Sequence, residues 1–524
     1  MTLISLNPAV YDTPHRTVVV MGVARSGTSM IAKVLETLGL FMGENQTKGS
    51  LEDKEISSLL EGFSTEQEFA KLIKERNNSH EVWGWKRPGA FKTLEKFEKH
   101  LRNPLYIFMI RDIAAISIRR SMAVNSDLKK NFFQAQKQYM MLVDFILNTS
   151  TPSLIVPNET ANINKAYFID SLINFLGIEV NKETRKLAIE TIEPNDNNYL
   201  LSMRKNQEKK GLNSYEKSEN TGISVLNPVN KISSNKSVVI LGLAGSETYK
   251  IAGVAKELGI YVGVDSNKKK LEDKEYIRLV EKGNGDEDVN TYILNNNKNK
   301  LWAINRPKAI NHITSYENIF PNIHYLILFK DSCSIAAARS TDVPKEFCHN
   351  FKLTTKQQKK LTSFVQETSK PCMLISHEKM RLNSNYFIDQ LIYFLGISPS
   401  KEQKTNAKKW LTGSEKNGKM HEFDRQRYVG VLEPIKNNIV KGWAIDIGDN
   451  NSIKLDLFIN GKLIDTILAN QYRKKLAVNG IGKGHHAYIY DISSHIASGK
   501  EYKITVKPHK TDLLLNNCPK SFKP

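Results

Sequence analysis

Short apolar runs alternate with longer amphipathic segments over most of the chain. The runs VVVMG at 18–22 and LYIFMI at 105–110 have the length of strands, and each precedes a segment with apolar positions at helical spacing. A third short run, LIV at 154–156, comes before another helical pattern. Buried strands that alternate with helices predict an α/β fold with a parallel sheet covered by helices.

This pattern occurs twice. The segment VVVMGVARSGTSMIAKVLETLGLFMG, which begins at 18, returns as VVILGLAGSETYKIAGVAKELGIYVG, which begins at 238. LEDKE at 51–55 returns at 271–275, and YFIDSLINFLGI at 167–178 returns as YFIDQLIYFLGI at 386–397. Similar segments in the same order at a nearly constant spacing predict two copies of one fold. We expect a first repeat at 1–205, a polar linker at 206–222 and a second repeat at 223–424.

The pattern changes in the last part of the chain. Short segments with alternating apolar positions follow one another, among them YVGVL, IVKGWAID, KLDLFI and YKITV. Asn460-Gly461 stands between two such segments, a typical signal of a two-residue hairpin turn. We expect an antiparallel β-sandwich at 425–524.

The amino-acid composition limits the kinds of molecule that the protein is expected to bind. The chain has 524 residues, a net charge of +20 and 40% hydrophobic residues, which indicates several globular domains that attract anions. The lysines are scattered and no basic run is interleaved with aromatic residues, so we do not expect nucleic acid as a partner. No apolar run is long enough to span a bilayer, and the N-terminus lacks a signal-peptide pattern. The expected location is the cytoplasm, with peripheral association at the inner face of a membrane left open.

The glycine-rich turn after the first strand indicates an anion site. Gly22 and Gly27 have the spacing of a phosphate-binding loop, but Thr28 stands where such loops carry a lysine. The glycines and the first amides of the next helix can approach a phosphate, and Arg25 can donate two hydrogen bonds to it. We therefore expect a nucleotide phosphate, though not a triphosphate. The four cysteines show no metal or disulfide spacing, and no metal is expected.

The two copies differ at this turn and at two other basic positions. A glutamate within the loop would repel a phosphate, so the comparison predicts that the first repeat binds the nucleotide and that the second is degenerate. The differences, in chain order, are Arg25 to Gly245, Gly27 to Glu247, Lys86 to Asn305 and Arg111 to Lys330.

The segments GVARSGTSMIAKVLETLG, VWGWKRP and YIFMIRDIAAISIRRS resemble the sulfotransferase family in its bacterial form. That family uses 3′-phosphoadenosine 5′-phosphosulfate (PAPS) as donor and releases 3′-phosphoadenosine 5′-phosphate (PAP). The resemblance implies that Arg111 binds the 3′-phosphate. The family's serine eight residues later is Arg119 here, with Ser117 nearby as another candidate. The 5′-phosphosulfate loop would consist of Arg25, Ser26, Gly27, Thr28 and Ser29.

Sulfuryl transfer requires charge stabilisation and removal of one proton from the acceptor hydroxyl. Arg25 and Lys86 are the candidates for stabilising charge. Glu52, which with Asp53 fits the family's acidic pair, and Glu44 are the two candidates for the base. Asp53 also completes the helix-capping pattern Ser50-x-x-Asp53, so a structural role is an alternative for it.

The C-terminal stretches GWAID and GIGKGHHAYIYDI resemble accessory β-modules of bacterial surface-polysaccharide glycosyltransferases. Together the two resemblances imply a sulfotransferase that acts on a hydroxyl of a carbohydrate, such as a capsule or lipopolysaccharide precursor, with polysaccharide-assembly glycosyltransferases as partners. The second repeat would complete the acceptor groove or pack as a pseudo-dimer. A P-loop kinase and a non-catalytic glycan-binding scaffold are the alternatives.

Overall fold

The computed structural model describes most of the chain. The described residues are 3–7, 14–44, 46–47, 50–62, 65–124, 126–192, 222–228, 235–263, 271–282, 285–320, 322–340, 345–412, 428–446, 452–478, 484–509, 511, 514–515 and 517–524. The linker predicted at 206–222 lies outside them except for Gly222. Two compact units are present: Met1–Ile163 with Ile173–Thr412, and Asn164–Leu172 with Gly413–Pro524. The domain boundaries expected from the sequence stay a prediction.

The first sheet has five strands in the order β1-β5-β4-β2-β3. Strands β2 to β5 run parallel, as the pattern predicts, and β1 pairs with β5 in the antiparallel direction. Sequence analysis did not predict β1, because three residues carry no periodicity. The strands are β1 (Ile4–Leu6), β2 (Arg16–Gly22), β3 (Val82–Lys86), β4 (Pro104–Ile110) and β5 (Ser153–Pro157).

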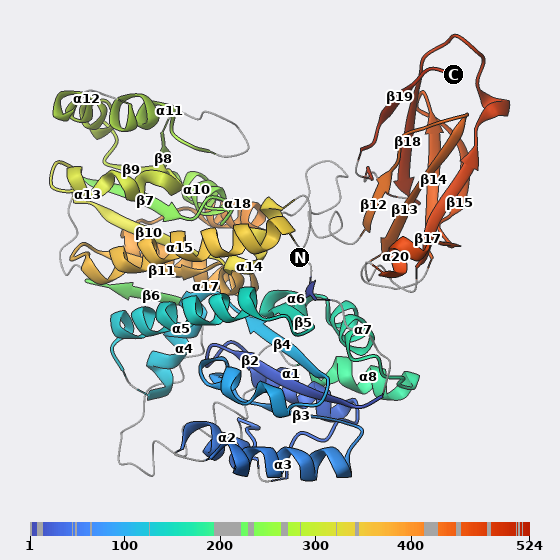
Figure 1. Ribbon diagram of the computed structural model, residues 1–524. Helices are drawn as coiled ribbons and strands as arrows, with labels where there is room; N and C mark the ends of the chain where they lie inside the picture. The colour runs from blue at the N-terminus through green and yellow to red at the C-terminus, as the bar shows by residue number, and fades with distance from the viewer. Residues whose placement is uncertain are drawn as a thin grey trace. The chain divides into compact units, whose positions relative to one another are not determined.

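Helices connect the strands of this sheet, and some of them begin at a side-chain cap (Figure 1). Asp53 accepts a hydrogen bond at the start of α2, and Thr65 forms a reciprocal capping box with Glu68 at the start of α3. These caps fix where α2 and α3 begin. The helices are α1 (Thr28–Thr37), α2 (Lys54–Glu61), α3 (Glu66–Ser79), α4 (Ile113–Val124), α5 (Leu128–Asn148), α6 (Asn158–Ile163), α7 (Lys165–Leu176) and α8 (Lys182–Thr191).

The second sheet has the order β6-β11-β10-β7-β9-β8, with β6 antiparallel to β11 and its other strands parallel. Its strands are β6 (Ile223–Leu226), β7 (Lys236–Gly242), β8 (Tyr261–Val262), β9 (Leu301–Asn305), β10 (His324–Phe329) and β11 (Cys372–Ser376). Its helices are α10 (Tyr249–Glu257), α11 (Lys274–Tyr276), α12 (Asp286–Asn297), α13 (Ile313–Tyr316), α14 (Ser332–Arg339), α15 (Lys345–Glu367), α16 (His377–Leu382), α17 (Ser384–Leu395) and α18 (Lys401–Thr412).

The two sheets also correspond in backbone detail. Asn7 has a φ of 53° and donates its side-chain amide to the carbonyls of Thr149 and Thr151. Asn227, with a φ of 51°, makes the equivalent bonds to Thr368 and Lys370. Residues other than glycine rarely adopt the left-handed conformation. Both sheets nevertheless have an asparagine in this conformation that bonds two equivalent carbonyls.

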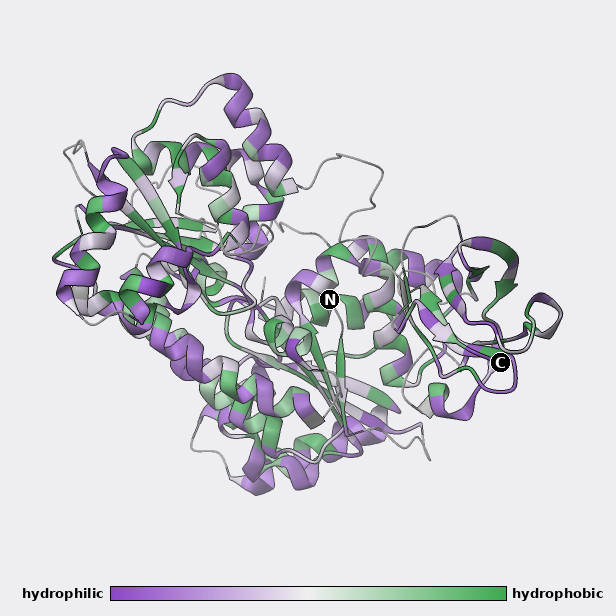
Figure 2. Ribbon diagram, turned by 90° about the horizontal axis from the view of Figure 1, so that it is seen from above, coloured by the Kyte–Doolittle hydropathy of each residue, from purple (hydrophilic) through white to green (hydrophobic). Residues whose placement is uncertain are grey.

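One apolar core connects the two sheets. A single cluster of buried side chains includes residues of β2 and β4 as well as residues of β7 and β10. Helix α5 packs on α15. The ring of Phe132 in α5 also lies 5.1 Å from that of Phe329, at the end of β10. Gln136 donates to the carbonyl of Thr355, its counterpart by sequence, at 3.2 Å. Contact between equivalent positions is the mark of a two-fold interface. In Figure 2 the central strands are coloured mainly as hydrophobic.

The C-terminal unit contains two antiparallel sheets, β12-β13-β17-β16 and β15-β14-β18-β19. The predicted hairpin forms between β14 and β15, with φ values of 48° at Asn460 and 82° at Gly461. Residues of both sheets share one apolar core, including Leu432, Val440 and Leu457. The elements are β12 (Tyr428–Leu432), β13 (Ile439–Asp446), β14 (Lys454–Ile459), β15 (Lys462–Leu468), β16 (Gln471–Tyr472), α20 (Lys474–Val478), β17 (His485–Asp491), β18 (Tyr502–Pro508) and β19 (Lys520–Phe522).

Among the residues that the structure describes, no helix has the length and apolar character needed to cross a bilayer.

Candidate functional site

The turn between β2 and α1 has the backbone of an anion-binding loop. Arg25 and Gly27 have φ values of 79° and 112°, so the chain twists through the left-handed region before α1 begins at Thr28. Asn158, at the end of β5, donates its amide to the carbonyl of Ser26 at 3.0 Å. A side chain at 27 would collide with that amide, which explains the glycine. The first amides of an α-helix lack the usual acceptor four residues earlier, so those at the start of α1 can bind an anion.

The residues at the start of α1 line a cavity of about 500 Å³ that lies at the carboxyl ends of β2 and β4. Ligands of open α/β sheets bind at this edge. Six cationic side chains and one carboxylate, Glu52, stand among its described lining residues. The cations are Arg25, Lys33, Lys86, Arg111, Arg119 and Arg120, and the polar residues include Thr28, Ser29, Asn158 and Asn162.

The structure brings most of the site residues named from the sequence to this cavity: Arg25, Gly27, Thr28, Ser29, Glu52, Lys86, Arg111 and Arg119. Ser26 and Ser117 are fully buried and are not among the lining residues. Glu44 is also not among them: its side chain is 70% exposed and lies 3.4 Å from Arg76. A base must reach the acceptor hydroxyl, and of the two candidates Glu52 is the one that borders the cavity.

Glu52 is held by two cations. Lys86 Nζ lies 3.0 Å from Glu52 Oε1, and Arg87 bonds the other carboxylate oxygen. The side chain of Lys86 is 1% exposed. Burial lowers the pKa of Lys86, while the adjacent charge of Glu52 opposes that change. Lys86 is therefore a buried cation with one described carboxylate partner, and it faces the space where an anionic ligand would lie.

Two cations of the cavity, Arg25 and Arg120, repel one another. Burial and the charge of Arg120 lower the pKa of Arg25, whereas Glu52 raises it. A bound anion would reduce this repulsion, and the cations would in turn stabilise the anion. Sequence reasoning missed Lys33, Arg120 and Asn158. Asn158 directly follows a predicted strand, a position at which polar residues often contact ligands, whereas Lys33 and Arg120 lie within helices and give no signal.

Asp53 has a structural role. Its side chain accepts a hydrogen bond from the amide of Ile56 at 3.0 Å and caps α2. Asp273 caps α11 in the same way through the amides of Glu275 and Tyr276. The aspartate at this position therefore caps a helix in both repeats.

Arg111 has a partner that the sequence did not indicate. Its Nε and Nη2 atoms each lie 3.2 Å from an oxygen of Glu378, which follows β11 in the second repeat. Both side chains are 4% exposed. The hydroxyl of Tyr139 donates to the carbonyl of Arg111 at 3.0 Å. Arg111, the residue predicted to bind the 3′-phosphate, is thus held by an ion pair between the repeats. It still lines the cavity.

The corresponding turn of the second repeat is filled by its own glutamate. Glu247, with a φ of 69°, lies 2.5 Å from Lys250, bonds Lys330 and approaches His377 Nε2 at 3.3 Å. Burial by itself would raise the pKa of Glu247. The hydrogen bond from His377 and the charges of His377, Lys330 and Lys250 outweigh burial and hold this pKa far below its usual range. A carboxylate of the chain itself thus forms ion pairs with the cations next to this turn.

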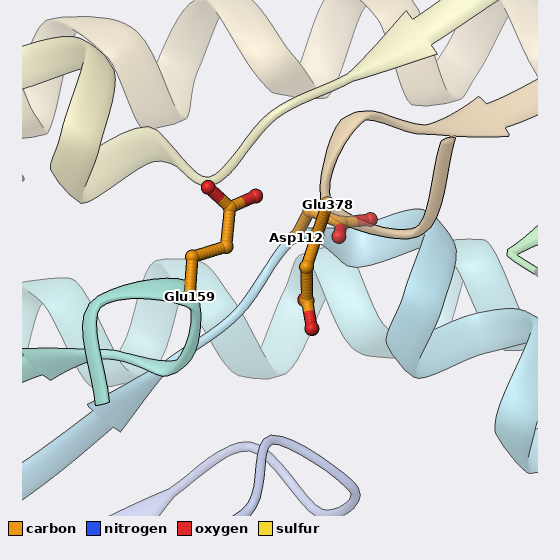
Figure 3. A group of neighbouring side chains, drawn as sticks. All are labelled: Asp112, Glu159 and Glu378. Carbon is orange, nitrogen blue, oxygen red and sulfur yellow. The ribbon is translucent and has the colours of Figure 1, made fainter. Parts of the chain in front are cut away.

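Three buried carboxylates, Asp112, Glu159 and Glu378, lie near one another where the repeats meet (Figure 3). Burial and the charge of Glu378 raise the pKa of Asp112 to about 7. Glu378 is paired with Arg111, and Glu159 lies 3.5 Å from His377 Nδ1. Because cations of the chain already compensate two of these carboxylates, the group is explained as an ion-pair network.

No protein-family model and no curated protein matches the chain. Among solved structures, a sulfotransferase domain from the Synechococcus PCC 7002 olefin synthase is similar with a TM-score of 0.26 and 15% identity, covering 37% of this chain and 86% of that one. A sulfotransferase domain from the curacin biosynthetic pathway is similar with a TM-score of 0.25 and 13% identity, covering 40% and 95%. Similarities this distant carry no conclusion about the chain.

Proposed function

We propose that the first repeat transfers a sulfuryl group from PAPS to a hydroxyl of a carbohydrate. The observation that carries this proposal is the cavity at the carboxyl ends of β2 and β4, where six cations surround Glu52 next to an anion-binding turn. A donor with a phosphosulfate at one end and a phosphate at the other has the complementary charge. The resemblance of the loop and of the Arg111 segment to sulfotransferases supports this choice of donor.

In this proposal the loop binds the phosphosulfate. Arg25 and the first amides of α1 would contact its oxygens, with the helix dipole behind them. Arg111 and Arg119, which also line the cavity, would bind the 3′-phosphate. Ser117 is fully buried and away from the described lining, so we leave it out of the contact set.

The chemistry would be an in-line displacement. The acceptor oxygen attacks sulfur, the bond from sulfur to the phosphate oxygen breaks, and PAP leaves with the electron pair. Glu52 takes the hydroxyl proton. Before the donor binds, Lys86 holds Glu52 at 3.0 Å. The sulfuryl oxygens would compete for Lys86, which leaves Glu52 more basic and places Lys86 where negative charge develops.

The acceptor is proposed from the C-terminal unit. Its resemblance to accessory modules of surface-polysaccharide enzymes favours a carbohydrate, such as a capsule or lipopolysaccharide precursor. The same resemblance favours polysaccharide-assembly glycosyltransferases as partners.

The test uses the full-length protein, PAPS labelled with ³⁵S, and candidate oligosaccharides and cell extracts. We expect labelled carbohydrate and release of PAP, unchanged by EDTA, because the proposed chemistry needs no metal. Transfer of phosphate from ATP that EDTA abolishes would support a P-loop kinase instead. Carbohydrate binding without PAP binding or transfer would support a glycan-binding scaffold, and either result would overturn the proposal.

A further inference from the structure

We infer that Glu378, which belongs to the second repeat, is a positioning residue for the nucleotide site of the first repeat. It would act by orienting Arg111 toward the cavity. The inference rests on the proposed function, because it concerns the arginine that we assign to the 3′-phosphate.

The geometry of the pair carries the argument. Glu378 accepts from Nε and Nη2 of Arg111, both at 3.2 Å, so the guanidinium plane is fixed in two directions. Both side chains are 4% exposed, which excludes the mobility of a surface ion pair. Arg111 still borders the cavity. The pair therefore leaves the remaining edge of the guanidinium, at Nη1, to meet a ligand phosphate.

Glu378 is itself fixed at the end of β11. Ser376, two residues earlier, donates its hydroxyl to Asp112 Oδ2 at 2.8 Å and ties this turn to the end of β4. The next residue, Lys379, is also buried; burial and the charge of Arg111 lower its pKa to about 8. The second repeat thus provides both a carboxylate that orients Arg111 and a cation near it.

The reciprocal contact is different, which argues against a purely structural role. Glu159 occupies the position in the first repeat that Glu378 occupies in the second, 219 residues later. It lies 3.5 Å from His377, and Lys330 stands where Arg111 would be. Lysine offers a point charge and no planar fork, so Glu159 has no guanidinium to orient. Both glutamates fill the interface between the repeats, but only Glu378 contacts a residue of the cavity's cationic set.

A competing explanation is that Glu378 blocks Arg111 and keeps phosphate away from it. The two explanations predict opposite signs when the carboxylate is removed. Loss of a positioning partner weakens phosphate binding, whereas loss of a competitor strengthens it.

The experiment measures PAP binding by calorimetry to the full-length wild type, Glu378→Gln and the matched control Glu159→Gln. For Glu378→Gln we expect a Kd about 10-fold weaker, a similar rise in KM for PAPS and little change in kcat, because the 3′-phosphate is remote from the reacting sulfur. Glu159→Gln loses a carboxylate of similar burial and should lower the unfolding temperature to a similar extent without weakening PAP binding. A merely structural role would make the two variants alike.

Arg111→Lys provides a second measurement if Glu378→Gln does not fold. It keeps the charge but cannot make the two-bond contact, and we expect a comparable loss of PAP affinity. Wild-type affinity or tighter binding in Glu378→Gln would overturn the inference alone. Wild-type affinity in Arg111→Lys would overturn the assignment of Arg111 to the 3′-phosphate together with the inference. Failure of the wild type to bind PAP would overturn the proposed function and the inference with it.

Discussion

Two turns have the same backbone conformation: the one between β2 and α1 and the one between β7 and α10. They differ in whether the nearby cations face a cavity or pair with a carboxylate of the chain. Both pass through the left-handed region twice, at Arg25 and Gly27 in one and at Gly245 and Glu247 in the other. In the first turn the nearby cations face a cavity. In the second, Glu247 contacts Lys250, Lys330 and His377. The glutamate that replaces glycine thus provides an internal anion for the cations of the second turn.

A second difference concerns the carboxylate that follows the turn. Glu52 bonds both Lys86 and Arg87, whereas Glu272 bonds Arg306, the counterpart of Arg87. The contact with the arginine is therefore common to the two repeats, and the contact with the lysine is present in the first alone, where the second has Asn305. This comparison assigns the arginine to the scaffold and makes Lys86 the better candidate for chemistry.

The largest effect is expected from Glu52→Gln. An amide cannot take the proton from the acceptor, so kcat should fall by about 10²- to 10⁴-fold with PAP affinity nearly unchanged. The measurement is the steady-state rate of labelled sulfate transfer. Glu272→Gln is the control from the second repeat and should keep the wild-type rate. A large loss in Glu44→Gln with a small one in Glu52→Gln would reassign the base.

Exchange of the two loop residues should produce the next largest effects. Gly27→Glu places a side chain against Asn158 and a carboxylate among the cations of the cavity, so PAP binding should fall by about 100-fold or more.

Glu247→Gly leaves buried Lys330 without its carboxylate, at a cost of roughly 3–5 kcal/mol of stability. Millimolar sulfate should restore part of this loss, because an anion that binds the folded state stabilises it.

Thermal unfolding at increasing sulfate concentration measures this restoration. The unfolding temperature of Glu247→Gly should rise more steeply with sulfate than that of the wild type. Equal slopes would show that Glu247 does not stand in for an external anion.

A pH-dependent effect is expected from the carboxylates between the repeats. Burial and the charge of Glu378 raise the pKa of Asp112 from 3.8 to about 7. The folded state therefore holds this proton more tightly, and the stability contributed below pH 4 is lost as the pH rises toward 7. Relative to Asp112→Asn, the wild type should lose up to about 1.4 kcal/mol per pH unit in this window.

Urea unfolding at a series of pH values gives this difference. Asp331, the counterpart, has a pKa raised to about 6 by burial and the charge of Glu159, so for Asp331→Asn the difference should level off nearer pH 6. A pH-independent difference between wild type and Asp112→Asn would contradict the assignment.

The sequence predicted the elements that local pattern controls. The parallel strands before each glycine turn, the hairpin at Asn460–Gly461 and the capping pattern at Asp53 are present where the periodicity and turn residues put them. The repeat also pointed to Glu247 as the decisive difference. These features depend on neighbours in the chain, which sequence patterns record.

The contact between Arg111 and Glu378 could not be predicted in this way. The two residues are 267 positions apart, and Glu378 has a counterpart, Glu159, with different contacts. Tertiary packing, including that of α5 on α15, brings the ends of β4 and β11 together. The position of Glu44, which contacts Arg76 and is not among the residues that line the cavity, likewise could not be predicted from the sequence.

The most direct test of the difference between the repeats is the stoichiometry of PAP binding by calorimetry. We predict one PAP per chain in the wild type, loss of binding by about 100-fold in Arg25→Ala, and wild-type binding in Lys330→Ala. Two PAP molecules per chain, or a loss of binding in Lys330→Ala that equals the loss in Arg25→Ala, would contradict the assignment of the nucleotide to the first repeat.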